Sequence, residues 1–255
     1  MAWLDLRWRH VRLRTQCGWV KVKREVKSVN ELERYSYVKA YVSLARYVFP
    51  WRVGPLSSLH LAYPIGTDFG VDIDGYMSRK PLVRRIYRGL EGLYEDEIEY
   101  ARLLALGARD VLRQNYTSIK AVFTGRRGYQ LWVLDFDWRD WVGREPRDLR
   151  DLVWLMVQAK ARYTRLLVSQ LTWIDRAHYN VLRDLTRVFA LPGTINRFTG
   201  LAVVEVDLDR PAISHVMYSA RLAARDWGHV RRQAPLCGDV GMSRSLSPRR
   251  EAAYK

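Results

Sequence analysis

Hydrophobic and polar positions alternate in several stretches of the chain, and this alternation predicts β-strands. "WLDLRWRHVRL", residues 3–13, predicts a strand with a basic face, and "KAYVSLARYVFP", residues 39–50, predicts a strand that ends at Pro50. "IKAVFTGRRGYQLWVLDF", residues 119–136, contains two β-rich runs around the turn "TGRRG", which is typical of a hairpin. Residues 191–207, "LPGTINRFTGLAVVEVD", predict a loop followed by another strand.

Other stretches follow a helical period. Ser28 or Asn30 can cap a helix whose first turn carries Glu31 and Glu33. Residues 81–115 repeat apolar side chains at helical spacing: Leu82, Ile86, Leu90, Leu93, Ile98, Ala101, Leu104 and Ala105. A further helix opens at Pro146, with Leu149, Leu152, Val153, Met156, Ala159, Tyr163 and Leu167 on its apolar side. The mixture predicts an α+β fold with mixed or antiparallel sheets flanked by helices.

Composition restricts the class of protein. The chain has 255 residues, 48% of them hydrophobic, which is enough for a large core. We expect a single domain over residues 1–237 and a basic, disordered tail over residues 238–255, which is rich in Ser and Arg. Two cysteines, Cys17 and Cys237, are too few for a zinc finger and do not indicate a disulfide scaffold.

The charge balance points to a polyanionic partner. The formal net charge is +16 and the pI is near 10.1, so nucleic acid is the favoured partner and an anionic membrane surface is the competitor. No apolar run approaches the roughly 18 residues of a membrane-spanning helix. The N-terminus interleaves charges with apolar residues and has no signal-peptide pattern, so we expect a cytoplasmic protein without membrane attachment.

Two aspartates lie one residue apart in "TDFGVDIDG", residues 67–75. In a strand, Asp72 and Asp74 project from the same face, while Val71 and Ile73 turn to the other. Adjacent carboxylates repel each other unless a cation lies between them, and Mg²⁺ or Mn²⁺ prefers such oxygen ligands. The pair predicts half of a metal site, and the alternative is an edge strand whose acids face water.

Two later stretches could complete that site. Arg126 and Arg127 lie in the glycine-flanked turn "TGRRG", where guanidinium groups and backbone N–H groups suit a triphosphate. A solvated basic hairpin tip is the alternative. Asp175 supplies a third carboxylate before a loop rich in Gly, Thr and Asn. Asp184 and Asp207 are rival third ligands.

The three stretches, in this order, resemble the archaeo-eukaryotic primase family, most closely the archaeal DNA primase small (catalytic) subunits. The motifs that carry the resemblance are "FGVDID", "TGRRGYQ", "WID" and "RVFALPGTINRFTG", with weaker similarity in "KAYVSLARYVFP" and "WVGREPRDLRDLV". Together they span roughly residues 38–215. The resemblance implies a primase-polymerase (RRM-like) catalytic core.

The resemblance also implies roles for single residues. Asp72, Asp74 and Asp175 would hold two divalent cations, Mg²⁺ or Mn²⁺. The residues that would contact the nucleoside triphosphate, ribo or deoxy, are Thr124, Gly125, Arg126, Arg127, Gln130, Arg187, Gly193, Thr194, Asn196 and Arg197. Expected partners are a single-stranded DNA template and a large primase subunit.

Departures from the family pattern qualify these expectations. Gln130 and Asn196 stand where family members usually carry histidine, Ala190 where they carry arginine, and Phe198 where they carry lysine. Gln and Asn can hydrogen-bond a phosphate but bring no positive charge, although Arg197 could restore one cation. No cysteine occurs between Gly75 and Thr124, so we expect no zinc knob and no structural zinc.

The leading hypothesis is therefore a DNA primase catalytic subunit that makes short RNA or DNA primers by two-metal nucleotidyl transfer. One alternative is a divergent, non-catalytic protein of the same family that binds nucleic acid or a partner subunit. Another is a repair polymerase that fills gaps at DNA ends. Sugar preference, primer length and the partner interface cannot be read from the sequence.

Overall fold

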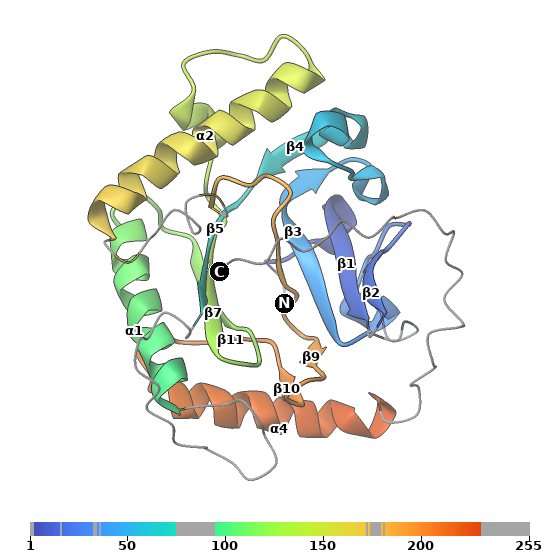
Figure 1. The fold of residues 1–255 in the computed structure, drawn as a ribbon, viewed down its shortest axis with the longest axis vertical. Coiled ribbons are helices and arrows are strands. Elements are labelled where there is room, and N and C mark those ends of the chain that lie inside the picture. The colour runs from blue at the N-terminus through green and yellow to red at the C-terminus, as the bar shows by residue number, and fades with distance from the viewer. Residues whose placement is uncertain are drawn as a thin grey trace, which may run out of the picture.

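The computed structural model describes residues 3–15, 17–32, 35, 37–74, 95–171, 173, 180 and 182–230. Two antiparallel sheets and three long helices are arranged in layers within this part of the chain (Figure 1). The first sheet, called here the N-terminal sheet, has the order β2-β1-β3-β4, and β8 also pairs with β3. The second, the central sheet, has the order β11-β6-β7-β5. The expected α+β class is confirmed.

The N-terminal sheet is formed by β1 (Arg9–Thr15), β2 (Gly18–Lys21), β3 (Lys39–Tyr47), β4 (Pro64–Thr67) and β8 (Val188–Ala190). The central sheet is formed by β5 (Phe69–Asp74), β6 (Ile119–Phe123), β7 (Gly128–Val133) and β11 (Val204–Glu205). A small hairpin pairs β9 (Ile195–Asn196) with β10 (Leu201–Ala202). The long helices are α1 (Glu95–Leu112), α2 (Leu149–Gln170) and α4 (Ala212–Val230).

The two faces of the central sheet are buried against different layers. Val71, Ile73 and Leu131 belong to the larger hydrophobic core, which the sheet shares with α1, α2 and α4. Val122 and Trp132 belong to a second core, where they pack against the N-terminal sheet. Because strand side chains alternate, the polar residues of β5 and β7 that share a face with Trp132 turn toward the N-terminal sheet.

Several elements differ from the sequence-based expectation at their ends. Residues Leu6–Trp8 form a 3₁₀ helix capped by Asp5, so the first strand begins only at Arg9. The helix expected after Ser28 is a short 3₁₀ turn, Val29–Leu32. Further along, the Val38 N–H donates to the Arg14 carbonyl of β1, next to the start of β3 at Lys39.

The remaining helices follow their predicted apolar periods. The helix expected from Pro146 begins at Leu149, where the Asp148 carboxylate accepts a hydrogen bond from the Asp151 backbone N–H at 2.8 Å. In α1, Ile98, Ala101 and Ala105 are buried, as the period predicts. The first half of that period, residues 81–94, and the expected tail, residues 238–255, lie outside the described residues.

A buried ion pair joins the two sheets. Asp68 lies between β4 and β5 and is 2% exposed. Its Oδ2 accepts a hydrogen bond from Arg9 Nη2 at 2.5 Å, and Arg9 Nη1 donates to the carbonyls of Ser43 and Leu44. The buried Asp68 carboxylate thus connects the two sheets.

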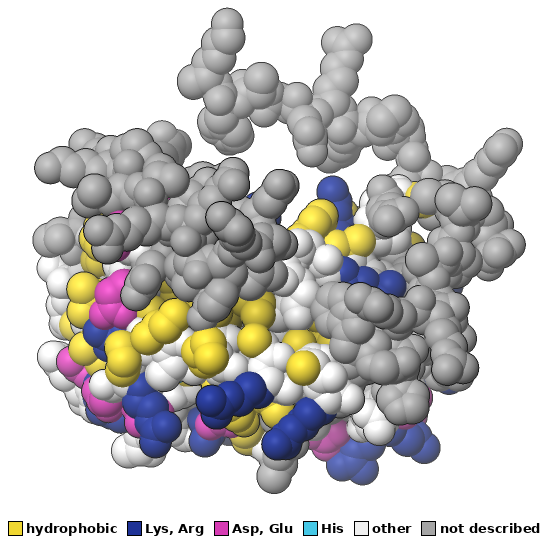
Figure 2. Space-filling model, turned by 90° about the horizontal axis from the view of Figure 1, so that it is seen from below, with side chains coloured by type: hydrophobic (Ala, Val, Ile, Leu, Met, Phe, Trp, Pro, Cys, Tyr) yellow, Lys and Arg dark blue, Asp and Glu magenta, His cyan; other side chains and the backbone are white. Residues whose placement is uncertain are grey.

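The face crossed by α4 mixes hydrophobic and cationic side chains (Figure 2). On α4, Met217 and Tyr218 are exposed, and on the neighbouring α1 Leu103 is exposed. Among the described residues, no helix is both long and apolar enough to cross a bilayer.

Candidate functional site

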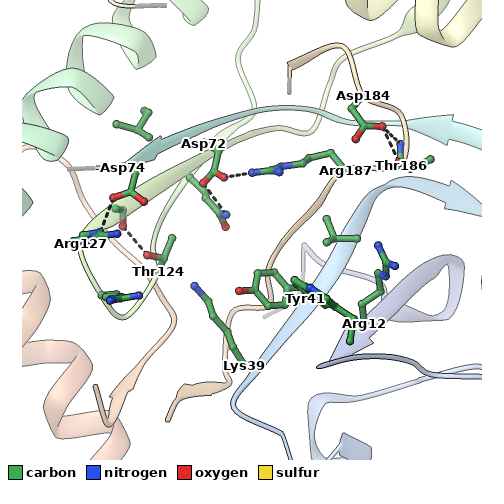
Figure 3. A pocket seen from close by; sticks show the side chains of 16 residues that line it. Arg12, Lys39, Tyr41, Asp72, Asp74, Thr124, Arg127, Asp184, Thr186 and Arg187 are labelled. Carbon is green, nitrogen blue, oxygen red and sulfur yellow. Dashed lines mark hydrogen bonds and ion pairs between the residues drawn. The ribbon is translucent and has the colours of Figure 1, made fainter. Parts of the chain in front are cut away.

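The two aspartates of β5 project side by side into a cleft between the sheets (Figure 3). Val71 and Ile73, which alternate with them, are buried in the helical core. The Asp72 side chain is 28% exposed and the Asp74 side chain 55% exposed. The predicted geometry of this pair is therefore present: one strand places both carboxylates on one face, open to solvent.

The cleft has a volume of about 550 Å³ and is predominantly polar. Its floor is β5 and β7, and β1, β2 and β3 form the opposite wall. The charged side chains that line it are Arg12, Lys39, Arg126, Arg127 and Arg187 against Asp72, Asp74 and Asp184. Five cations face three carboxylates, which suits an anionic ligand larger than a single carboxylate.

Each β5 aspartate is bonded to an arginine from a different segment. Arg127 Nε donates to Asp74 Oδ1 at 2.9 Å, and Arg187 Nη2 donates to Asp72 Oδ2. Opposite charges at this separation offset the repulsion between the neighbouring carboxylates. The chain thus brings together two of its predicted phosphate ligands and two of its predicted metal ligands.

Gln130 fixes the orientation of Asp72. The two residues face each other across β5 and β7, and Gln130 Nε2 donates to Asp72 Oδ1 at 3.0 Å. Gln130 Oε1 accepts from the Ala190 backbone N–H at 2.9 Å, which determines which end of the amide faces Asp72. Gln130 is 4% exposed, so its amide cannot form hydrogen bonds with water, and these two bonds satisfy it instead.

The turn between β6 and β7 presents Arg126 to the cleft. Thr124 closes the turn, because both its backbone N–H and its hydroxyl donate to the Gly128 carbonyl, at 3.0 and 3.1 Å. Gly125 adopts φ +72°, which favours glycine. Arg126 is exposed, and among the described residues it forms no ion pair with an acid; its guanidinium lies 5.9 Å from the Phe198 ring centroid.

Asp184 lines the same cleft but is used to shape its own loop. Its Oδ1 accepts from the backbone N–H and the hydroxyl of Thr186, at 2.8 and 2.7 Å. The Asp184 carbonyl accepts from Lys160 Nζ at 3.2 Å. These bonds hold the segment that carries Arg187.

Lys160 was not among the predicted site residues. It is fully buried on α2, and this burial lowers the pKa of Lys160 to about 8. The negative charges of Asp184 and Asp68 oppose part of this decrease. Its position in the predicted apolar period of the helix, between Met156 and Tyr163, was the only sequence signal.

The wall opposite the aspartates carries Arg12, which belongs to the predicted basic face of the first strand, and residues that the sequence analysis did not assign to the site. Lys39 and Tyr41 lie on β3 and Arg12 on β1 (Figure 3), and Trp19 lies on β2. Burial lowers the pKa of Lys39 to about 8, which the charge of Asp72 partly opposes. The alternation of residues 39–47 was the signal that could have placed Lys39 and Tyr41 on one face.

The predicted nucleotide loop lies beside the arginine turn and does not line the cleft. Thr194 and Asn196 are buried, and each bonds within its own loop, Thr194 Oγ1 to the Leu191 carbonyl and Asn196 Oδ1 to the Phe198 N–H. Gly193 has φ +82° and donates its N–H to the Val203 carbonyl. The Arg197 guanidinium lies 5.2 Å from the Tyr37 ring centroid. Nucleotide contact by these four residues stays a prediction.

The donor set fits divalent cations in part. Asp72 and Asp74 offer carboxylate oxygens on one accessible face. Among the described residues, however, no three acidic, histidine or cysteine side chains are grouped closely enough to hold a metal ion. The predicted third ligand, Asp175, lies outside the described residues.

Comparison with known proteins finds similarity among solved structures. No protein-family model matches the chain, and no curated protein matches it. Among solved structures, it is similar to the polymerase domain of ligase D from Mycobacterium tuberculosis in complex with DNA. The sequence identity is 13% and the TM-score 0.46, and the similarity covers 88% of this chain and 87% of that chain. A similarity at this level says nothing about the side chains of the cleft, whose chemistry follows from the geometry above.

Proposed function

We propose that this protein is a nucleotidyltransferase of the primase-polymerase type, which synthesises short primers on single-stranded DNA. The observation that carries the proposal is that Asp72 and Asp74 lie on one strand face in a cleft whose lining has five cations and one further carboxylate, Asp184. The motif resemblance to archaeal primase catalytic subunits adds the reaction class. A complex with a large primase subunit belongs to the same proposal.

The reaction joins a primer 3′-hydroxyl to the α-phosphorus of a nucleoside triphosphate. A new O–P bond forms as the bond to the β-phosphate breaks; pyrophosphate leaves, and the hydroxyl proton passes to solvent. Divalent cations, when bound, would activate the hydroxyl and neutralise the leaving group. Asp72 and Asp74 would hold them, with a third ligand to be supplied by Asp175 or by Asp184 after its loop bonds rearrange.

The arginines have a defined part in this scheme. Arg126 is available to a phosphate without breaking an ion pair, because it forms none with the described acids. Arg127 and Arg187 neutralise Asp74 and Asp72 in the ligand-free protein. A triphosphate carries more negative charge than a carboxylate, so the two guanidinium groups would bind its oxygens instead of the aspartates. Asp72 and Asp74 would then be free to bind the divalent cations.

The same ion pairs favour a second candidate function. Two adjacent carboxylates repel each other, which destabilises a protein that does not use them in catalysis. This cost is removed when each carboxylate has its own counter-ion. Arg127 and Arg187 provide such counter-ions, so a protein that only binds nucleic acid could keep this cleft as a stable polar network. In that case strand binding would persist while synthesis is absent.

The test is primer synthesis on single-stranded DNA with labelled ribo- and deoxynucleotides and Mg²⁺ or Mn²⁺. We expect products from the wild-type protein and at least a hundredfold loss in the Asp72→Asn, Asp74→Asn double variant, since ligand carboxylates are removed without adding bulk. Asp207 was a rival third ligand in the sequence, but neither Asp207 nor Asp209 lines the cleft. They form a matched control, because they are an exposed pair with the same spacing and form ion pairs with Arg210 and Arg109.

The control variant Asp207→Asn, Asp209→Asn should keep wild-type synthesis. Products from the double β5 variant at the wild-type level would contradict the proposal. A wild-type protein that binds the template but makes no product, alone or with a large primase subunit, would support the non-catalytic function instead.

A further inference from the structure

One face of the N-terminal sheet carries cationic and aromatic side chains in register. Across β2, β1 and β3, Trp19 is opposite Arg14, and Arg14 is opposite Lys39. One step along, Lys21 is opposite Arg12, and Arg12 is opposite Tyr41. The alternate residues of β1, Val11 and Leu13, are buried in the second core. Two rows of three side chains therefore share one face, called here the basic-aromatic face.

The indole of Trp19 is exposed in a way that folding does not require, whereas Tyr41 beside it is partly buried. Trp19 is 46% exposed on β2, at the edge of the sheet, and its ring centroid lies 4.9 Å from that of Tyr41. The guanidinium groups of Arg12 and Arg14 each lie 5.6 Å from the indole centroid. A planar indole flanked by guanidinium groups is a surface on which an unpaired base can stack.

The charges of the face are complementary to phosphate. Arg12 and Arg14 are exposed, and neither forms an ion pair with an acid in the described part of the chain. Lys39 Nζ lies 5.3 Å from the Tyr41 centroid. Four of the six side chains also line the cleft that contains Asp72 and Asp74, namely Arg12, Trp19, Lys39 and Tyr41. The basic-aromatic face is thus continuous with the candidate site.

We propose that the basic-aromatic face binds single-stranded nucleic acid, with one base stacked on the indole of Trp19 and the neighbouring phosphates held by Arg12 and Arg14. The face leads an unpaired strand into the cleft opposite the β5 aspartates. The inference rests on the proposed function only where it identifies this strand as the template.

The test measures binding of a fluorescein-labelled oligothymidylate by anisotropy in a chelator, so that metal-dependent chemistry does not enter. Trp19→Ala should weaken binding at least about fivefold, since stacking on one aromatic ring contributes this much or more. Trp19→Phe keeps an aromatic ring and should stay within about threefold of wild type. Trp154→Ala is the matched control, because Trp154 is 52% exposed on α2 with Arg144 5.9 Å from its ring, away from the cleft.

A second measurement does not depend on the tryptophan. The double variant Arg12→Gln, Arg14→Gln should reduce the slope of log affinity against log salt concentration by about 1.4, because each lost phosphate contact on a single strand contributes about 0.7. Affinity and slope that match wild type in both sets of variants would overturn the proposal. An equal loss of affinity for a free nucleoside triphosphate in Trp19→Ala would also overturn it, since the face would then be a nucleotide pocket.

The two proposals can fail separately. If Trp19→Ala loses strand binding while the wild-type protein makes no primer, the proposed function fails and the strand-binding face stands. If metal-dependent synthesis is found while Trp19→Ala binds the oligothymidylate as tightly as Trp154→Ala does, the face fails and the proposed function stands.

Discussion

At the scale of single residues, Gln130 links Asp72 to the backbone of β8 through both ends of its amide. A glutamine amide always has a donor and an acceptor, so Gln130 can donate to Asp72 and accept from the Ala190 N–H at the same time. Gln130 is therefore a fixed, neutral link between β5, β7 and β8.

Lys39 makes the pH dependence of strand binding testable. Burial lowers the pKa of Lys39 to about 8, so the free protein loses this charge as the pH rises through 8. A bound phosphate favours the protonated form, and affinity should therefore be highest below pH 8 and fall toward pH 9. In Lys39→Arg the charge persists, so binding of oligodeoxyadenylate should be nearly independent of pH from 7 to 9.

The control for this measurement is Lys27→Arg, an exposed lysine outside the cleft. It should keep the wild-type decrease. Equal decreases in Lys39→Arg and in wild type would show that another group titrates.

At the scale of elements, the hairpin of β6 and β7 depends on glycine for its contact with β5. A Cβ atom at Gly128 would lie 2.4 Å from the Ile73 carbonyl oxygen. The atoms nearest to this Cβ position all belong to the backbone of Ile73 and Asp74, so no flexible side chain could move aside. Gly128 pairs with Asp74 across the two strands, so this close contact keeps the arginine turn directly beside Asp74.

We expect Gly128→Ala to destabilise the protein by about 2 kcal/mol, because a strand would have to shift to remove the clash. Gly107→Ala is the matched control: Gly107 is exposed in α1, nothing lies within 4 Å of its Cβ position, and alanine favours helix. Urea unfolding should show a lower midpoint for Gly128→Ala and an equal or higher one for Gly107→Ala. An unchanged midpoint in Gly128→Ala would mean that the turn can move without cost.

At the scale of the whole molecule, local patterns predicted the elements and tertiary pairing determined the cleft. The face shared by Asp72 and Asp74 and the hairpin around "TGRRG" follow from strand alternation and turn chemistry, both of which are local. Lys39 and Lys160 were missed because their neighbours come from distant segments: Asp72 across the cleft in one case, and the Asp184 loop in the other.

The order of strands explains why the basic-aromatic face could not be read from sequence. Its rows exist only because β1 lies between β2 and β3 in a particular register, with Arg14 opposite both Trp19 and Lys39. A shift of one residue would turn Arg14 inward and Leu13 outward. The sequence predicts a first strand with a basic face. It does not predict the sheet that aligns this strand with Trp19, Lys39 and Tyr41.

The arginines bonded to Asp72 and Asp74 also separate folding from metal binding. Because Arg127 and Arg187 already neutralise the two acids, the protein carries internal counter-ions and needs no divalent cation to reach its native state. A chelator should leave the melting temperature within about 1 °C of its value in untreated protein, and a fall of several degrees would contradict this. Any metal dependence of synthesis would then report on the reaction itself, not on a protein that has lost its structure.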